Sequence, residues 1–257
     1  MKRARWTLQV AGLVLANIGL VEFLKVGICA PFFYCHSCPA AGFACPIGLL
    51  QNYAALGSFP FYALGILGVF ALAAGRFWCG WLCPFGTVQD VLHRIRGRRD
   101  ATQLPHTPWT KFLVLGITLL LAWIFADLMF CKVCPAGSLF AAIPHRFASP
   151  ELDFGSFFYV HVATLVIALA AFFLIGRVWC RYLCPLGAVL GAFNRLSIIK
   201  VRVDPARCTG CAECLDVCPM KITEVKDIED CTDCIRCGRC VEACEAEALK
   251  ISASLRG

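Results

Sequence analysis

The sequence predicts an all-α membrane domain of four transmembrane helices with a two-fold internal repeat, followed by a small, cysteine-rich α+β domain. The 257-residue chain is 59% hydrophobic and only 16% charged, which is too apolar for an ordinary soluble domain. Its 19 cysteines fall into spaced runs, and one cysteine pattern recurs in two halves of the apolar part. We expect the membrane domain over residues 1–200, with halves of about 1–100 and 101–200, and the second domain over 201–257.

Four apolar stretches are long enough to cross about 30 Å of hydrocarbon, which takes roughly 20 helical residues. They cover residues 6–30, 57–75, 112–130 and 157–175. The first follows three basic residues, and its length favours an uncleaved anchor over a signal peptide.

The basic residues predict the orientation of these spans. By the positive-inside rule, the cytoplasmic side holds the N-terminus, the loop 93–99 and the segment 195–202. With Arg76, Lys111, Arg177 and Arg181, these hold 14 of the 17 Lys and Arg residues of 1–203. We therefore expect a multi-pass protein of a bacterial or archaeal inner membrane, with both termini and the C-terminal domain in the cytoplasm. No nucleic-acid-binding motif accompanies the net charge of +7.

The C-terminal domain carries two runs of the form Cys-x2-Cys-x2-Cys-x3-Cys. In two-cluster ferredoxins the fourth cysteine of each run ligates the other cluster. On that pattern one [4Fe–4S] cluster is expected on Cys208, Cys211, Cys214 and Cys244, and a second on Cys218, Cys234, Cys237 and Cys240. Zinc is the alternative for a single Cys-x2-Cys pair, but two interlocking runs disfavour it. The segment resembles the bacterial 2[4Fe–4S] ferredoxin, and Cys231 is an extra thiol before its second run.

The membrane part contains a repeated pattern of Cys-x2-Cys-Pro, one span, and Arg-x-Trp-Cys-x2-Leu-Cys-Pro-x-Gly. A pseudo-twofold axis along the membrane normal is expected to bring the two halves together. The pattern predicts a proximal set on the side of the C-terminal domain, Cys79, Cys83, Cys180 and Cys184, and a distal set on the opposite face, Cys35, Cys38, Cys131 and Cys134. For both sets a metal or cluster, a dithiol–disulfide pair and structural thiols stay open.

Two further cysteines have no partner in this repeat. Cys29 is expected to be a buried small hydrophobe. Cys45 precedes a proline, and its membership of the distal set stays open. The helix is expected to break at the second cysteine of each proximal pair, because a following proline disfavours helical backbone there.

Other polar and aromatic residues have two interpretations each. Arg76 and Arg177 are either interfacial anchors or charges that stabilise thiolates. An interfacial aromatic belt is the preferred explanation for Trp78, Trp81, Trp179 and Tyr182. Quinone or haem binding is an alternative to a structural role for His36, His145 and His161. Asp127 is a candidate for proton release, while Glu22 and Lys25 can pair with each other.

Over about Arg76 to Cys244 the chain resembles the polyferredoxin-type quinol dehydrogenase subunits of the NapH/NosR/CcoG group. The resemblance implies cluster ligation by the eight C-terminal cysteines and electron transfer between the quinone pool and redox partners. It marks Cys79, Cys83, Cys180 and Cys184 as the membrane motif cysteines. The distal pairs and Cys45 are not carried over from that group.

The expected function is a membrane-bound iron–sulfur relay between a ferredoxin module and either the quinone pool or an extracytoplasmic partner. The chain would then be a quinol dehydrogenase subunit of an oxidoreductase complex. The expected cofactors are two [4Fe–4S] clusters, one or two further clusters or metals in the membrane domain, and a quinone. Membrane lipid and redox proteins on one or both faces are the expected partners. The alternatives are a transmembrane thiol–disulfide conduit and a maturation factor for a metalloenzyme.

Overall fold

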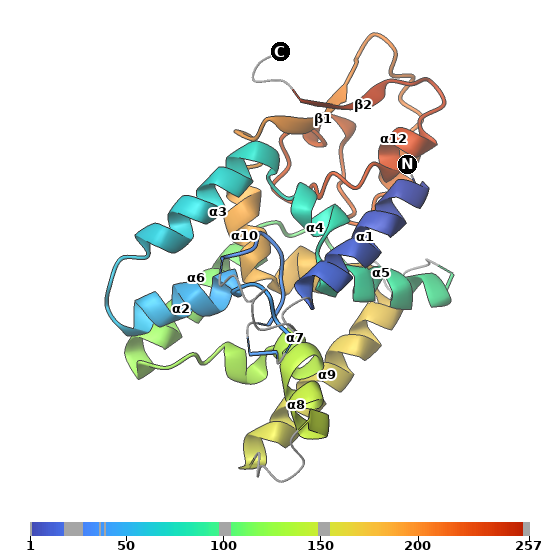
Figure 1. The fold of residues 1–257 in the computed structure, drawn as a ribbon. Coiled ribbons are helices and arrows are strands. Elements are labelled where there is room, and N and C mark those ends of the chain that lie inside the picture. Colours follow the sequence, from blue (N-terminus) through green and yellow to red (C-terminus); the bar gives the residue numbers. More distant parts are fainter. Residues whose placement is uncertain are drawn as a thin grey trace.

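The computed structural model describes residues 2–17, 28–35, 37–38, 40–97, 104–148 and 155–253. These residues form a mostly helical molecule with one small pair of strands in the part of the chain that the structure describes. The cysteine-rich C-terminal segment lies at one end of the molecule, and α8 (Ile143–Ala148) lies at the other (Figure 1).

The two halves of the apolar part contain the same order of elements. The first half holds α1 (Lys2–Ala16), α2 (Pro46–Ala55), α3 (Phe61–Ala74), α4 (Phe77–Trp81) and α5 (Pro84–Ile95). The second holds α6 (Thr110–Phe125), the turn η3 (Cys131–Val133), α7 (Pro135–Gly137), η4 (Ser138–Ala142), α8, α9 (Gly155–Leu174), the π-helical turn η5 (Trp179–Leu183) and α10 (Pro185–Ala192). Among the described residues, α1, α2, α3, α4 and α5 follow the same order as α6, the α7–α8 run, α9, η5 and α10.

One described helix is long and apolar enough to cross a membrane, over Phe157–Leu174. The helices found within the predicted spans 57–75 and 112–130 are shorter, at 14 and 16 residues. Pro60 precedes α3 and Gly75 ends it at φ 50°, while α6 ends at Ala126 with φ 48°. Proline and left-handed residues both interrupt helical hydrogen bonding, so α3 begins late, after Pro60, and α6 ends early, at Ala126. The predicted span 6–30 contains α1 and extends beyond the described residues.

The C-terminal segment is closed by two strands. β1 (Ile199–Val203) pairs antiparallel with β2 (Leu249–Ala253), with Val201 opposite Ile251. Between the strands lie α11 (Glu213–Asp216), the turn η6 (Val225–Asp227) and α12 (Arg239–Ala243). Pairing of β1 with β2 holds the two ends of the segment together around its cysteines.

An aromatic cluster fills the centre of the helical part. The Phe85 ring lies 5.6 Å from Phe33, 5.4 Å from Phe172 and 5.9 Å from Trp179, measured between ring centroids. Such edge-to-face rings add to the burial of their apolar surface. Because Trp179 and Trp81 are 9% and 7% exposed, they belong to the interior, and the predicted interfacial belt is wrong for both.

Candidate functional site

The eight predicted cluster cysteines line two cavities in the C-terminal segment. A cavity with an empty volume of about 370 Å³ is lined by Cys208, Cys211, Cys214 and Cys244. The other, of about 380 Å³, contains Cys218, Cys234, Cys237 and Cys240. The first cavity takes three cysteines from one run and the fourth from the other. The second takes three from the second run together with Cys218, and Cys214 also lines it. Three cysteines of one run with a fourth from the other is the arrangement of a two-cluster ferredoxin. The donor set and the space both fit [4Fe–4S] clusters.

Three of these cysteines, Cys214, Cys234 and Cys237, are buried, and a buried thiolate needs a positive partner. Burial raises the pKa of Cys234 to about 12, so its thiol without a ligand holds its proton at neutral pH. A cluster core supplies the positive charge that stabilises the thiolate. Cys231 lies outside this arrangement, and its sulfur accepts a hydrogen bond from the Asp233 backbone N–H at 3.4 Å.

The four proximal cysteines meet beneath the C-terminal segment. All are buried, with 4–5% of their surface exposed. Cys83 is close enough to Cys79 and Cys180 to interact electrostatically, and Cys184 likewise interacts with Cys180 and Cys79. The predicted helix breaks are present, because Cys83 and Cys184 are extended, at φ −66° and ψ 115°, and φ −76° and ψ 108°. A new helix begins at the proline after each.

Two arginines connect the halves of this site reciprocally. Arg76 of the first half donates to the Cys180 carbonyl of the second at 2.7 Å. Arg177 of the second half donates to the Cys79 carbonyl of the first, also at 2.7 Å. Both are fully buried, with 0% and 1% of their surface exposed, so they are not interfacial anchors. Their charges instead lie beside the proximal thiols, which is the arrangement that favours thiolates.

The glycines of the two Cys-Pro-x-Gly motifs make room for these arginines. A Cβ built at Gly86 would lie 2.8 Å from Nη1 of Arg177, and one at Gly187 would lie 2.9 Å from Nη2 of Arg76. Each motif therefore needs its glycine because the arginine of the other half packs against it. These arginine–glycine contacts are therefore reciprocal between the two halves.

Each arginine has a buried carboxylate partner. Arg177 makes two bonds to Asp90, at 3.0 and 2.7 Å, and Arg5 and Arg239 also pair with that carboxylate. Burial alone would raise the pKa of Asp90, but the arginines outweigh it and hold the pKa well below its usual range. Arg76 bonds Asp233 at 3.0 Å, and Lys111 and His106 pair with the same carboxylate.

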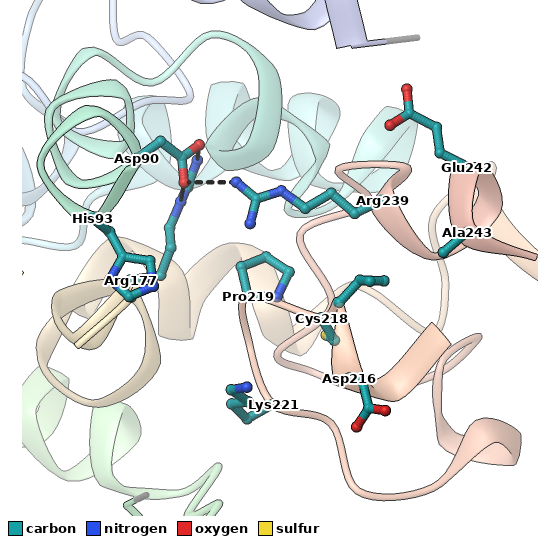
Figure 2. A pocket seen from close by; sticks show the side chains of 12 residues that line it. Asp90, His93, Arg177, Asp216, Cys218, Pro219, Lys221, Arg239, Glu242 and Ala243 are labelled. Atoms are coloured by element: carbon teal, nitrogen blue, oxygen red, sulfur yellow. Dashed lines mark hydrogen bonds and ion pairs between the residues drawn. The ribbon is translucent and has the colours of Figure 1, made fainter. Parts of the chain in front are cut away.

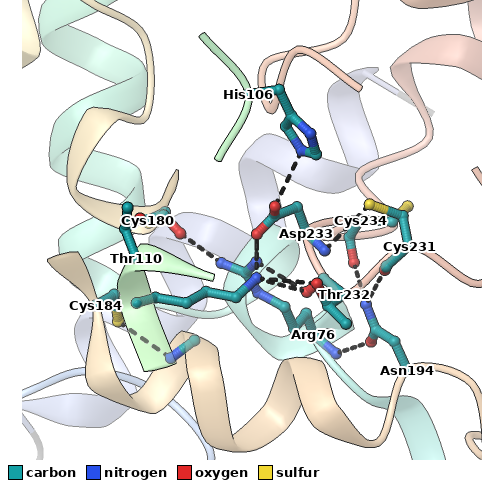
Figure 3. A network of polar contacts seen from close by, with 12 residues as sticks. Arg76, His106, Thr110, Cys180, Cys184, Asn194, Cys231, Thr232, Asp233 and Cys234 are labelled. Carbon is teal, nitrogen blue, oxygen red and sulfur yellow. Dashed lines mark hydrogen bonds and ion pairs between the residues drawn. The ribbon is translucent and has the colours of Figure 1, made fainter. Parts of the chain in front are cut away.

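Figure 3 shows how Arg76 joins the two cysteine regions. Its Nη1 donates to the Thr232 carbonyl at 3.1 Å, while its Nη2 reaches Cys180. Asn194 donates to the Cys231 and Cys234 carbonyls at 2.8 and 2.9 Å. The loop that carries the second cluster run is thus bonded directly to the proximal site.

Close backbone contacts strengthen this docking. A Cβ at Gly80 would lie 2.4 Å from the Ile235 carbonyl, and one at Gly191 would lie 2.5 Å from the Thr232 carbonyl. The Trp81 indole donates to the Arg236 carbonyl at 2.9 Å. The C-terminal segment is therefore seated on α4 and α10 without an intervening layer of side chains at these glycines.

A larger polar pocket lies beside the docking region (Figure 2). It has an empty volume of about 930 Å³ and is bordered by α5, α11 and α12. The cluster cysteine Cys218 lines it together with Asp90, Arg177, Lys221 and Arg239. The pocket therefore reaches a predicted cluster ligand from the outside of the molecule.

The distal cysteines differ from the predicted set at one position. A cavity with an empty volume of about 320 Å³ is lined, among the described cysteines, by Cys35, Cys45, Cys131 and Cys134. Cys38 is described but does not line it, and its sulfur lies 3.2 Å from the Tyr34 hydroxyl. We call this the distal cavity. Cys29 is fully buried, as expected.

The other predicted candidates have ordinary partners. His161 bonds the Ser138 hydroxyl at 3.0 Å, and His145 bonds the Ser37 carbonyl at 2.8 Å. Asp127, the candidate for proton release, is 43% exposed and pairs with Lys132. His36, Glu22 and Lys25 lie outside the described residues.

Sequence reasoning missed the buried acids and amides of the site. Asp90 and Asp233 carry no motif that distinguishes them from surface acids. Gln89 donates to the Cys180 sulfur at 3.3 Å, and Gln51 donates to the Cys131 sulfur at 3.4 Å. The sequence did contain a signal for the two glutamines, because each follows a Cys-Pro-x-Gly motif at the same spacing.

Comparison with known families agrees with this description. A "4Fe-4S binding domain" model matches residues 42–62, 56–101 and 157–203, and a "4Fe-4S dicluster domain" model matches residues 200–245. The chain belongs to the NapH/MauN ferredoxin-type family. Its relationship to the known members is distant.

Three relatives illustrate this distance. YccM of Escherichia coli strain K12, named as a candidate electron transport protein, is 30% identical over 157 residues, which cover 60% of this chain. The ferredoxin-type protein NapH of the same organism is 27% identical over 161 residues, or 61% of this chain. The methylamine utilization ferredoxin-type protein MauN of Paracoccus denitrificans is 28% identical over 186 residues, or 69% of this chain.

The chain spans only part of the length of these curated relatives. The matched region covers 44% of YccM, 52% of NapH and 62% of MauN. No solved structure matches the chain.

Proposed function

We propose that this protein is a membrane-embedded electron relay in which the proximal cysteines hold a third cluster next to the two ferredoxin clusters. The observation that carries the proposal is the docking of the second cluster run on the proximal site. Arg76 bonds Cys180 at one end of its guanidinium and the loop Thr232–Asp233 at the other. Within this interface, the proximal site is therefore the cysteine set next to the ferredoxin cavity at Cys234, and an electron that leaves this cavity passes to it.

The proximal residues fit an iron–sulfur cluster chemically. Four buried thiols come from two halves, two arginine guanidiniums lie beside them, and the Gln89 amide donates to one sulfur. Hydrogen bonds to sulfur and nearby charge are the means by which a protein sets a cluster potential. The "4Fe-4S binding domain" matches at 56–101 and 157–203 contain all four of these cysteines. The bound clusters supply the redox chemistry by accepting and giving single electrons.

The proposed membrane placement has the ferredoxin segment in the cytoplasm and the distal cavity toward the opposite face. It is supported by the apolar helix Phe157–Leu174, the shorter apolar helices Phe61–Ala74 and Thr110–Phe125, and the distribution of basic residues. A quinone in the membrane or a redox protein on either face exchanges electrons with the relay. A quinol that gives two electrons becomes a quinone and releases two protons. Because each cluster accepts a single electron, the relay takes the two electrons one at a time.

Reduction of the purified, full-length protein tests this function. Menadiol is added anaerobically to the chain in lipid nanodiscs, and bleaching of the cluster absorption is followed. We expect the wild type to be reduced by menadiol and by dithionite. Cys180→Ala should slow menadiol reduction at least tenfold, while dithionite still reduces the ferredoxin clusters. Cys29→Ala, which changes a buried thiol outside the cysteine sets, is the matched control.

The outcomes separate the candidate functions. A wild type reduced by dithionite but not by menadiol would remove the quinol and leave a protein partner as electron donor. If Cys180→Ala keeps the iron content and the menadiol rate of the wild type, the proximal cluster is wrong. An iron content of about eight per chain, the amount held by two [4Fe–4S] clusters, would instead support the thiol–disulfide conduit.

A further inference from the structure

The distal cavity resembles the proximal site, but one of its four cysteines differs from the distal set that the sequence spacing suggests. We propose that Cys35, Cys45, Cys131 and Cys134 bind a fourth [4Fe–4S] cluster, and that Cys38 does not ligate it. The place of this cluster in an electron relay rests on the proposed function above. The binding of iron by these four cysteines is tested independently of that function.

The space in the distal cavity matches the space in the ferredoxin cavities. Its empty volume is about 320 Å³, against about 370 and 380 Å³ for the two cavities of the C-terminal segment. The likeness in size favours the same kind of group in the distal cavity as in the two ferredoxin cavities.

The backbone at Cys45 and Cys134 has the conformation of the proximal cysteines. Cys45 lies at φ −71° and ψ 121°, and Cys134 at φ −76° and ψ 118°. Each is followed by Pro-x-Gly at the start of a helix. Cys83 and Cys184 have the same Cys-Pro-x-Gly motif at the start of α5 and α10. The distal counterpart of Cys83 is therefore Cys45.

A glutamine extends the correspondence beyond the cysteines. Residues 45–51 and 83–89 both read Cys-Pro-x-Gly-x-x-Gln. Gln51 donates to the Cys131 sulfur at 3.4 Å, and Gln89 donates to the Cys180 sulfur at 3.3 Å. In each case a glutamine of the first half bonds the first cysteine of the pair from the second half. Two sites with the same ligand framework and the same donor to sulfur fit the same kind of cofactor.

Cys38 is held by a separate contact. Its sulfur lies 3.2 Å from the Tyr34 hydroxyl, which also bonds the Asn17 side chain at 2.6 Å. The Tyr34 ring packs on Phe140 with centroids 4.7 Å apart, so the hydroxyl is fixed in place. Cys38 is thus bonded to Tyr34 at the edge of the distal cavity, and its own sulfur is not among the four that line it.

Aromatic side chains connect the distal cavity with the proximal site. Phe33 and Phe130 line the distal cavity, and both rings contact Trp179, with centroids 6.2 and 6.3 Å apart. The Phe33 carbonyl accepts a bond from the Cys83 sulfur at 3.8 Å. One layer of residues therefore separates the two sites. The distal cavity begins at α2 and α7, and Figure 1 shows α7 farther from the strands than α4 and α10.

Iron and acid-labile sulfide per full-length chain test the assignment. The wild type is expected to hold about sixteen of each, because each [4Fe–4S] cluster contributes about four. Cys45→Ala should lower both by about four, and the matched variant Cys38→Ala should leave both unchanged. Equal iron in Cys45→Ala and the wild type, iron loss in Cys38→Ala, or one zinc ion per wild-type chain would each overturn the proposal.

A second variant keeps the proposal testable if Cys45→Ala does not fold. Gln51→Leu removes the amide bond to the Cys131 sulfur and leaves all four thiols. We expect it to shift the midpoint potential of one cluster and leave the others as in the wild type, whereas unchanged potentials would overturn the proposal. If menadiol fails to reduce the wild type but Cys45→Ala still loses iron, the distal cluster is supported and the quinol-fed relay is rejected.

Discussion

At the scale of single residues, the site depends on buried charges that are balanced in groups. Asp90 is 3% exposed at its side chain and receives Arg5, Arg177 and Arg239 from three separate parts of the chain. Gln9 also donates to it at 3.0 Å. Removing one partner from such a group is costly, because the remaining charges stay buried without compensation.

Asp90→Asn should therefore lower the free energy of unfolding by about 3 kcal/mol, the effect typical of breaking a buried ion pair. Chemical denaturation in detergent, followed by circular dichroism, measures it. Asp127→Asn is the control, since the Asp127–Lys132 pair is largely exposed, and no measurable change is expected there. A similar stability for both variants would show that the arginines find other partners.

A glycine next to a buried arginine gives a second prediction at this scale. The Cβ of Gly187→Ala would lie 2.9 Å from Nη2 of Arg76, which is already bonded to Cys180. Displacing a packed group of this kind costs about 1–3 kcal/mol. Thermal unfolding in nanodiscs should show the loss, while Gly68→Ala, which meets no atom within 4 Å, should melt at or slightly above the wild type because alanine favours a helix over glycine.

At the scale of elements, the loop before α6 and the loop of the second cluster run are joined by His106 and Asp233. The two side chains lie 3.0 Å apart, and Lys111 at the start of α6 pairs with the same carboxylate. His106, Cys231 and Asp233 place their ligand atoms within 4.8 Å of one another. Because Arg76 and Lys111 already neutralise Asp233, this group is an ion-pair network and not a cation site.

The His106 pair predicts a dependence of stability on pH. The bonds to Asp233 and then to Cys231 raise the pKa of His106 to about 9, above its value of about 6.5 in an unfolded chain. The protonated histidine therefore stabilises the fold fully below about pH 6.5, and this contribution is lost as the pH rises through about 9. The melting temperature of the wild type should fall over this range more than that of His106→Gln. Parallel curves for the two proteins would contradict the prediction.

The same scale shows why the predicted spans were longer than the helices. Hydropathy begins at residue 57 in one span and continues to residue 130 in the other, but α3 begins only at Phe61, after Pro60, and the left-handed backbone at Ala126 ends α6. The helix breaks at Cys83 and Cys184 were predicted correctly, since proline has a local steric effect that depends only on its neighbour. The helix α2 was not predicted, because Pro46–Ala55 carries no charge pattern that separates it from the adjoining span.

At the scale of the whole molecule, the cysteines form a series from the ferredoxin segment to the distal cavity. The described part of the ferredoxin segment contains one two-stranded sheet and three short helical turns. So little regular structure gives a small apolar core, and binding of the clusters then contributes directly to folding. The helices α6 and α9 are held by packing against other helices and do not depend on iron in the same way.

Removal of iron should therefore unfold one end of the molecule first. After treatment with a chelator and an oxidant, hydrogen exchange of residues 204–248 should become fast, while α6 and α9 keep their protection. Mass spectrometry of the iron-loaded and iron-free full-length chains measures both regions at once. Retained protection in residues 204–248 would show that the segment folds without its clusters.

The sequence by itself determined the cysteine runs, the interlocked pairing in the ferredoxin segment and the repeat of the apolar part. These features depend on spacing along the chain, which is fixed by covalent geometry. Only the tertiary structure decided that Arg76 and Arg177 cross to the opposite half, that Asp90 and Asp233 balance them, and that Cys45 and not Cys38 lines the distal cavity. Those choices arise where separate segments pack together, and packing depends on contacts between residues far apart in the sequence.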